Sequence, residues 1–298
     1  MTLATLGTEA ANDRTTDLDT MSVSELLRVM NEEDQTVPIA VAAALPAIEQ
    51  AVDAIVSARR RGGRLIYLGA GTSGRLGVLD AVECPPTFGT DPGEVIGLIA
   101  GGDRAFLAAV EGAEDDPELA VHDLRQIGLT GDDVVVGIAA SGRTPYVIGG
   151  LDHAGRIGAA TVAVACNVGA EISAHADIAI EVSTGAEVLT GSTRLKAGTA
   201  QKLVCNMLST ATMIRTGKVF HNLMVDVRPT NAKLVDRARR IVTAATGRDP
   251  ETAGATIDSA GGHAKTAVVM LLGNCDYPSA VQRLERAGGD VRAAIALS

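Results

Sequence analysis

The stretch "IYLGAGTSGRLGVLDAVECPP", residues 66–86, joins a short apolar run to a glycine-rich turn and then to a helical pattern. Gly69, Gly71 and Gly74 fit the pattern G-x-G-x-x-G, in which glycine lets backbone N–H groups come close to a phosphate. Two hydroxyl side chains and an arginine stand beside these glycines. The stretch therefore predicts a strand, a turn and a helix, with an anion site at the turn.

Four further apolar runs follow at regular intervals. The five runs are "RLIYLGA" (64–70), "VIGLIAG" (95–101), "DVVVGIAA" (133–140), "ATVAVAC" (160–166) and "IAIEV" (178–182). Each is too short for a core helix and rich in Val and Ile, and helix-like segments separate them. Continuous apolar runs are typical of strands that are buried on both faces. We therefore expect an α/β fold with a parallel sheet of about five strands and helices on both faces.

The flanking segments have helical patterns. Ser22 and Glu25 fit a capping box at the start of a helix, and residues 38–63 have helical periodicity and end in basic residues and glycines. A long helical pattern covers 193–220, and three short helices are expected after Gly247. We predict three parts: 1–62, a leader and helices that pack on the core; 63–246, the α/β domain; and 247–298, a small helical module.

Composition excludes several classes of protein. The formal net charge is −10, which disfavours nucleic acid as a partner but leaves room for a local anion site. No apolar run reaches the roughly 18 residues that cross a membrane, and the first residues lack a signal-peptide pattern, so we expect a cytoplasmic protein without membrane contact. Four widely spaced cysteines form no C-x-x-C pair, so we expect no metal site and no disulfide.

A second strand end carries a loop similar to the first. "ASGRT", residues 140–144, repeats the Ser-Gly-Arg of residues 73–75. Parallel strands end at one edge of the sheet, so the two loops could hold one phosphate from two sides. A dinucleotide is disfavoured, because "GLIAGG" ends without the acidic residue that a ribose needs. The other possibility is that the glycines only permit tight turns. The candidate ligand residues in the two loops are Thr72, Ser73, Gly74, Ser141, Gly142, Arg143 and Thr144.

Glu83 is a candidate general acid. Pro85 and Pro86 should end the preceding helix near it, and a carboxylate at a helix C-terminus has a raised pKa because it faces the negative end of the dipole. A raised pKa suits an acid that works near neutral pH. The alternative is an ordinary exposed carboxylate.

Two other groups of carboxylates follow. Glu111 and Glu114 are three residues apart and should share a helical face, either as a solvated acidic turn or with one of them pointing at a ligand. Glu187 precedes Ser192 and Lys196, which suits a polar anionic ligand and equally suits a capped helix start.

Several long blocks together resemble the N-acetylmuramic acid 6-phosphate etherase family. They are "GAGTSGRLGVLDAVECPPTFG", "GLIAGG", "AVEGAEDD", "VVVGIAASGRTPYV", "EVLTGSTRLKAGTAQK" and "GKVFHNLMVDV". The resemblance runs from Thr8 into the C-terminal module, whose last 50 or so residues match only in pattern. It implies the sugar-isomerase (SIS) fold.

The resemblance also implies an activity. The substrate would be N-acetylmuramic acid 6-phosphate, a sugar phosphate, and the products N-acetylglucosamine 6-phosphate and D-lactate, with no metal or organic cofactor. Glu83 matches the acid/base glutamate of the family and Glu114 its second glutamate, while Glu187 remains an alternative base at C2. Ser192 and Lys196 would join the two loops in binding substrate, and a homodimer is expected.

Two other functions remain open at this point. A sugar-phosphate isomerase would use the same phosphate site and a base at C2, but would need no acid for a leaving group. A sugar-phosphate sensor would bind without turnover. The glucokinase regulatory protein resembles this family and is such a sensor, but it is much longer and has two SIS halves.

Overall fold

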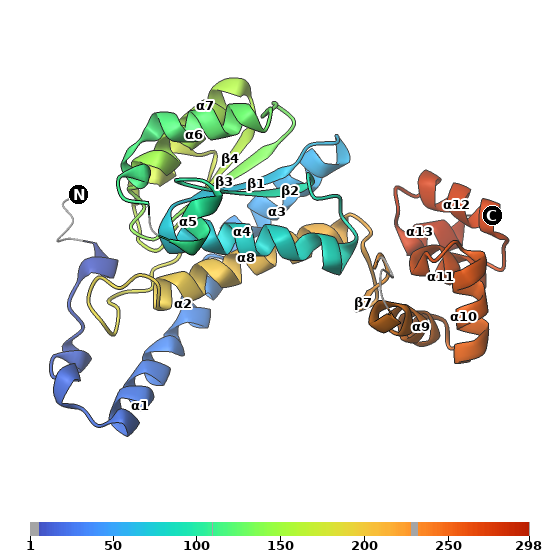
Figure 1. The fold of residues 1–298 in the computed structure, drawn as a ribbon, viewed down its shortest axis with the longest axis horizontal. Coiled ribbons are helices and arrows are strands. Elements are labelled where there is room, and N and C mark those ends of the chain that lie inside the picture. Colours follow the sequence, from blue (N-terminus) through green and yellow to red (C-terminus); the bar gives the residue numbers. More distant parts are fainter. Residues whose placement is uncertain (1–5, 109, 228–231, 298) are drawn as a thin grey trace. The chain divides into compact units, whose positions relative to one another are not determined.

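The computed structural model describes residues 6–108, 110–227 and 232–297 (Figure 1). The chain forms two compact units, one from Met1–Val82 and Gly93–Ser209 and the other from Glu83–Pro92 and Thr210–Ser298. The first unit contains the α/β fold and the second is mainly helical.

The first unit is built on a parallel five-stranded sheet. Its strands are β1 (Leu65–Gly69), β2 (Val95–Ile99), β3 (Val134–Ala139), β4 (Ala160–Ala165) and β5 (Ile178–Glu181), in the order β2-β1-β3-β4-β5. Each strand lies inside one of the five apolar runs, so the predicted sheet is confirmed. The strands are mostly apolar because helices cover both faces of the sheet (Figure 1).

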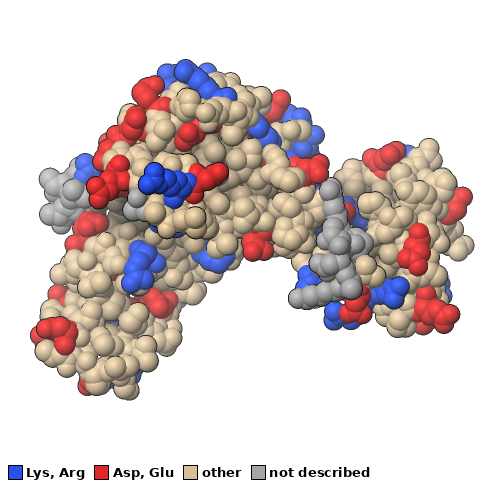
Figure 2. Space-filling model, viewed as in Figure 1, with Lys and Arg blue, Asp and Glu red and all other residues tan. Residues whose placement is uncertain are grey.

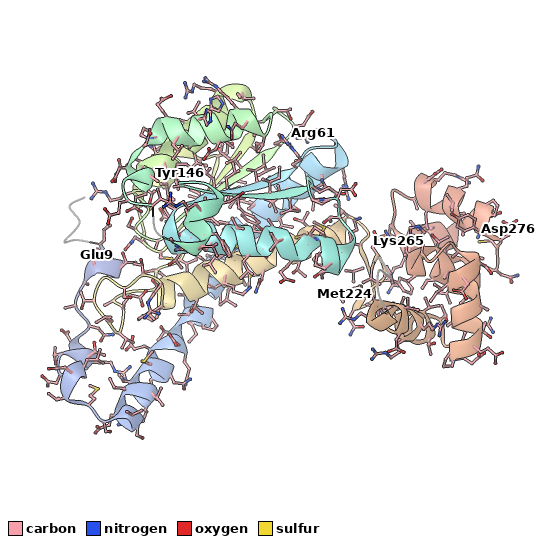
Figure 3. All side chains as sticks on the ribbon, viewed as in Figure 1. Glu9, Arg61, Tyr146, Met224, Lys265 and Asp276 are labelled. Carbon is pink, nitrogen blue, oxygen red and sulfur yellow. The ribbon has the colours of Figure 1, made fainter. Side chains whose placement is uncertain are left out.

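Helices α6 (Pro117–Gln126) and α7 (Pro145–Ile157) lie on one face of the sheet, and α3 (Leu45–Arg60), α4 (Gly71–Phe88) and α8 (Lys196–Arg215) on the other (Figure 1). Successive residues of β1 point to opposite faces. Leu68 packs in the cluster formed with α6 and α7. Tyr67 instead donates its hydroxyl to Asp80 of α4 at 2.8 Å. Tyr146 at the start of α7, labelled in Figure 3, donates its hydroxyl to Asp123 of α6 at 2.6 Å.

The order of the strands fixes where a ligand can bind. The chain leaves β1 for β2 at one edge and then crosses back to β3 on the other side of β1. The loops that follow β1 and β3 therefore lie next to each other, at the carboxyl ends of paired strands. In open α/β sheets this switch of direction opens the crevice that binds ligands.

Asp133 fastens the opposite, amino-terminal ends of β1 and β3. Its carboxylate accepts hydrogen bonds from the backbone N–H of Arg64 at 2.8 Å, the Arg64 guanidinium at 2.7 Å and the N–H of Thr130 at 2.9 Å. Burial alone would raise the pKa of Asp133, but these bonds hold it below its ordinary value. The buried carboxylate is therefore fully ionised at neutral pH.

Asp133→Asn is expected to destabilise the protein by about 3 kcal/mol, because it leaves the Arg64 guanidinium half-paired in a buried site. The melting temperature should fall by about 6–12 °C at pH 7. The matched control is Asp132→Asn next to it, whose carboxylate makes only an exposed pair with Arg61 and should cost less than about 1 kcal/mol.

The pH dependence gives a second readout for this variant. A lowered pKa stabilises the folded state above the ordinary value of 3.8 and loses that effect as pH falls through the lowered pKa. The difference in melting temperature between the wild type and Asp133→Asn should therefore shrink in strong acid. A difference that stays constant with pH would contradict this account.

The amino-terminal residues form short 3₁₀ helices and two α-helices before α3. The 3₁₀ helices are η2 (Gly7–Glu9), η3 (Asp13–Thr15) and η4 (Leu18–Thr20), and the α-helices are α1 (Val23–Asp34) and α2 (Thr36–Ala43). The capping box of Ser22 and Glu25 is present, as predicted. The helical pattern expected over 38–63 is divided at Ala44, between α2 and α3.

Three short elements complete the first unit: α5 (Asp103–Leu107), η5 (Ala113–Asp115) and η6 (Glu171–His175). Among the described residues no single helix is long and apolar enough to cross a membrane, and only the bent pair Val23–Ala43 and Leu45–Arg60 passes that test by length and composition.

Besides the ends of α4 and α8, the described part of the second unit contains five complete helices and a small hairpin. They are β6 (Val219–Phe220), β7 (Leu223–Met224), α9 (Ala232–Thr246), α10 (Pro250–Ser259), α11 (Ala264–Leu272), α12 (Tyr277–Arg286) and α13 (Val291–Ala296). Four helices follow Gly247 where three were expected. One hydrophobic cluster extends from Phe220 to Ala294, so α9 packs with the helices that follow it. Asp226 accepts from Lys218 at 3.0 Å and from Lys265, which is labelled in Figure 3, at 2.8 Å.

Candidate active site

The loop after β1 passes tightly over the end of its own strand. The N–H of Gly74 donates to the carbonyl of Ala70 at 3.1 Å. A Cβ on Gly74 would lie 2.5 Å from the Gly69 oxygen, so only glycine fits there. Gly71 has a φ of +51° and begins α4. The first N–H groups of a helix have no partner within it, and here they lie at the sheet edge where a ligand is expected.

The loop after β3 has the same character. Gly142 has a φ of +74°, and a Cβ there would lie 2.4 Å from the side chain of Ala170. Thr144 is the N-cap residue of α7, and its side chain makes no capping hydrogen bond. Ser141 and Thr144 are half-buried, so their hydroxyls remain within reach of a ligand. The Nε–H of Arg143 donates to Glu171 at 3.2 Å, so one of the donors of this guanidinium is engaged within the fold.

Asn167 holds the loop after β3 in place, and sequence reasoning missed it. It follows β4 and is buried. Its amide oxygen accepts from the N–H of Thr8 at 3.2 Å, while its NH₂ group donates to the carbonyls of Ala140 at 3.2 Å and Ser141 at 3.4 Å. The amino-terminal segment is thereby attached to the second loop. The only signal in the sequence is a polar residue directly after a buried strand.

A cavity of about 260 Å³ opens beside the first loop. It is lined by Ala70 and Gly71 after β1, by Ala100 after β2 and by residues 110–114. Glu111 and Glu114 both line it and both are exposed. They do not share a helix as expected, because Glu111 lies in a turn and Glu114 in η5. The structure thus brings Glu114 and the glycine-rich loop to one cavity at the carboxyl ends of β1 and β2.

Arg75 forms part of the same cavity wall. Its guanidinium donates to the carbonyl oxygens of Ala105 at 2.8 Å and Phe106 at 3.0 Å, at the end of α5. Arg75 therefore links the segment after β2 to the start of α4. These two bonds occupy donors of its guanidinium that an anion could otherwise accept from.

Glu83 lies on α4 and is exposed. The expectation that the helix stops beside it is wrong: α4 continues to Phe88 with Pro85 and Pro86 inside it. Each proline removes one N–H donor and with it one bond to the preceding turn, and α4 nevertheless continues for two residues beyond Pro86. Glu83 therefore lies inside the helix, one turn before its end, and not at its C-terminus.

Glu187 caps the start of α8. It is fully buried, and its carboxylate accepts from the N–H groups of Lys196 at 2.9 Å and Ala197 at 3.0 Å. The Lys196 ammonium is also buried and donates to Glu33 of α1 at 2.7 Å. Of the two possibilities left open by the sequence, the geometry is that of a capped helix start. Ser192 lies in the turn before α8, where its N–H donates to the carbonyl of Leu189.

Glu187→Gln is expected to destabilise the protein by about 1–3 kcal/mol, because one buried N–H of α8 loses its acceptor. For the activity that the sequence resemblance implies, proton exchange at C2 of N-acetylmuramic acid 6-phosphate should continue, because the carboxylate of Glu187 is bonded within the fold. Thermal melting and proton exchange measure the two effects. The control is Glu118→Gln, in the exposed first turn of α6. Loss of exchange with an unchanged melting temperature would make Glu187 the base.

The surface and the ligating residues give no sign of a metal centre. Among the described residues, no group of three or more His, Cys, Asp or Glu side chains is arranged to hold a metal ion. On the face shown in Figure 2, acidic and basic side chains are interspersed among uncharged ones. The candidate ligands for the expected anion are the backbone donors and hydroxyls of the two loops.

Comparison with known proteins agrees with this fold. The model of the SIS domain matches residues 118–211, and the model of the glucokinase regulatory protein N-terminal SIS domain matches residues 47–155. Among solved structures, the E. coli CFT073 protein c3406 has a TM-score of 0.50 at 16% identity, over 68% of this chain and 97% of that one.

Three relatives are similar over nearly their whole length, and each is named N-acetylmuramic acid 6-phosphate etherase. The protein of Mycolicibacterium smegmatis is 65% identical over 99% of both chains. The protein of Exiguobacterium sp. is 60% identical over 97% of this chain and 99% of its own. The protein of Listeria monocytogenes serotype 4b is 61% identical over 97% of this chain and 98% of its own. The chain therefore belongs to the N-acetylmuramic acid 6-phosphate etherase family.

Proposed function

We propose that this protein cleaves the D-lactyl ether of N-acetylmuramic acid 6-phosphate with water, giving N-acetylglucosamine 6-phosphate and D-lactate. The observation that supports this most strongly is 65% identity to an etherase over 99% of both chains. The position of Glu114 in a cavity beside a glycine-rich loop, at the carboxyl ends of β1 and β2, fits the same chemistry.

The reaction is proposed to run by elimination and then hydration. An ether is a poor target for direct attack by water. In the open-chain sugar, however, the proton on C2 lies next to an aldehyde and is acidic. A carboxylate removes that proton, and lactate leaves from C3 when a general acid protonates the ether oxygen. Water then adds to the unsaturated intermediate at C3, and a proton returns to C2.

The two carboxylates have different roles in this proposal. Glu114 is the base at C2, since it lines the cavity and its carboxylate is open to a ligand. Glu83 is the acid that protonates the ether oxygen and then the base that activates water. Its exposed place on α4 leaves it free for proton transfer, while its role rests on the match to the family's acid/base glutamate.

The phosphate is proposed to bind where the loops after β1 and β3 meet. The hydroxyls of Thr72, Ser73, Ser141 and Thr144 would donate to it, with the backbone at Gly74 and Gly142. The tight turns at these glycines support this, because they bring N–H groups to the sheet edge. Phosphate binding far from C2 and C3 would keep the reacting atoms aligned.

We also propose that the working form is a cytoplasmic homodimer, as the resemblance to SIS-fold etherases implies. Light scattering on the eluted peak of a sizing column measures the mass of the particle, and a monomer would overturn the assembly without affecting the chemistry.

The proposed function is tested by incubating the purified protein with N-acetylmuramic acid 6-phosphate and measuring D-lactate with a D-lactate dehydrogenase. Equal amounts of D-lactate and N-acetylglucosamine 6-phosphate are expected. The sugar without its phosphate is the control and should react far more slowly. Binding of the phosphorylated sugar without release of lactate would contradict the proposal and indicate a sensor.

A further inference from the structure

The side chains of Ser73 and Gln201 form a buried pair beneath the first loop. Ser73 lies in the first turn of α4 and Gln201 in the second turn of α8. The hydroxyl of Ser73 donates to the amide oxygen of Gln201 at 2.9 Å. Gln201 is 1% exposed, so it can act on a ligand only through Ser73.

The amide of Gln201 is only half satisfied. Its NH₂ nitrogen is buried and has no hydrogen-bond partner among the described residues. Asn167, which fixes the second loop, makes a useful contrast because both ends of its amide are bonded. A buried N–H without a partner destabilises the folded state, so stability alone does not account for an amide at this position.

The hydrogen of the Ser73 hydroxyl also points the wrong way for a phosphate. A serine hydroxyl has one hydrogen to donate. While that hydrogen goes to Gln201, Ser73 presents only lone pairs to a ligand, and a phosphate oxygen accepts but does not donate. Turning the amide by 180° lets its NH₂ group donate to Ser73, which frees the hydroxyl hydrogen. The unpaired heavy atom is then the amide oxygen instead of the nitrogen.

We propose that Gln201 is a positioning residue whose amide turns when substrate binds, so that the Ser73 hydroxyl donates to the phosphate. The inference rests on the proposed function, because it places the phosphate at the loop that holds Ser73. Each orientation of the amide leaves one atom unpaired, so the two orientations are close in free energy and the phosphate can select between them.

Gln201→Glu and Gln201→Met separate this role from a purely structural one. At neutral pH a carboxylate can only accept, so it keeps the Ser73 hydrogen turned inward, and KM should rise at least about tenfold with kcat within about threefold. Methionine makes no such bond and leaves Ser73 free to turn outward, so KM should rise less than about threefold. Gln126→Glu, exposed on α6, is the matched control.

The pH profile gives an independent readout. Protonating the new carboxyl of Gln201→Glu restores a donor toward Ser73, and burial should raise its pKa into an accessible range. The excess KM of this variant over the wild type should therefore fall as pH falls. Thermal melting of each variant confirms that the compared proteins are folded.

Equal KM values for the Glu and Met variants, or a larger rise for Met, would overturn the proposal. So would an excess KM that does not change with pH. Calorimetric titration with N-acetylglucosamine 6-phosphate and with inorganic phosphate gives a test without turnover. Gln201→Glu should bind both ligands more weakly than Gln201→Met does. If the wild type released no lactate, the proposed function would fail, and these titrations would still decide the role of Gln201.

Discussion

Glu83→Gln is expected to lower the kcat for lactate release about 100- to 10,000-fold, which is the usual contribution of a general acid or base. The amide of glutamine has nearly the shape of the carboxyl group but cannot give a proton to the ether oxygen. Lactate would then have to leave as an unprotonated alkoxide. Binding of the sugar phosphate should change little, because the two loops proposed to hold the phosphate are intact.

Deuterated water shows which step the substitution stops. With Glu114 in place, C2 of the substrate should still lose its proton and recover deuterium from the solvent. Glu83→Gln should therefore yield N-acetylmuramic acid 6-phosphate labelled at C2, with little lactate. Glu49→Gln, exposed on α3, is the control and should behave as the wild type. Normal lactate release by the Glu83 variant would remove this residue from the mechanism.

Glu114→Gln is expected to stop the reaction one step earlier. Both lactate release and exchange of the C2 proton should fall about 100- to 10,000-fold, because the base itself is lost. Mass spectrometry of the substrate recovered from deuterated water measures the exchange directly. The two glutamate variants should thus differ in exchange while both lose lactate release.

The chain offers a close control for Glu114. Glu111 lies three residues earlier and lines the same cavity, so Glu111→Gln makes the same chemical change in the same surroundings. It should retain at least about a third of the wild-type exchange rate, since a surface substitution away from the reacting atoms shifts free energies by about 0.5 kcal/mol. If the Glu111 variant lost exchange and the Glu114 variant kept it, the assignment of the base would be reversed.

The sheet could be predicted from the sequence because burial on both faces leaves a clear pattern. Strands such as Val134–Ala139 are apolar at every position and end in polar, glycine-containing loops. The two candidate phosphate loops could be predicted for a different reason. Their backbone needs glycine at positions of positive φ, such as Gly142, and glycines next to polar residues are visible in the sequence.

Local rules failed where other parts of the chain decide the conformation. The pair Pro85–Pro86 predicted the end of a helix, but α4 continues to Phe88. Spacing predicted a shared helical face for Glu111 and Glu114, but this segment forms a turn and a 3₁₀ helix against the first loop. Sequence periodicity and proline rules reflect local preferences of the backbone. They contain no information on tertiary packing, which can override those preferences.

Polar partners that lie far apart in sequence were also missed. Lys196 pairs with Glu33, Asn167 with Thr8 and Ser73 with Gln201, across 163, 159 and 128 residues. No pattern in one sequence links such residues. As a result, the sequence assigned Lys196 and Glu187 to a ligand from residue type alone and did not predict that their charged groups are buried and bonded within the fold.

The most direct test of cleavage at C3 is to run the reaction in water enriched in the heavy oxygen isotope and to analyse both products by mass spectrometry. Elimination followed by hydration predicts D-lactate without heavy oxygen and N-acetylglucosamine 6-phosphate with one heavy oxygen at C3. Unlabelled N-acetylglucosamine 6-phosphate kept in the same water corrects for exchange at C1. Heavy oxygen in the hydroxyl of lactate would mean that the bond on the lactyl side breaks, and would contradict the mechanism.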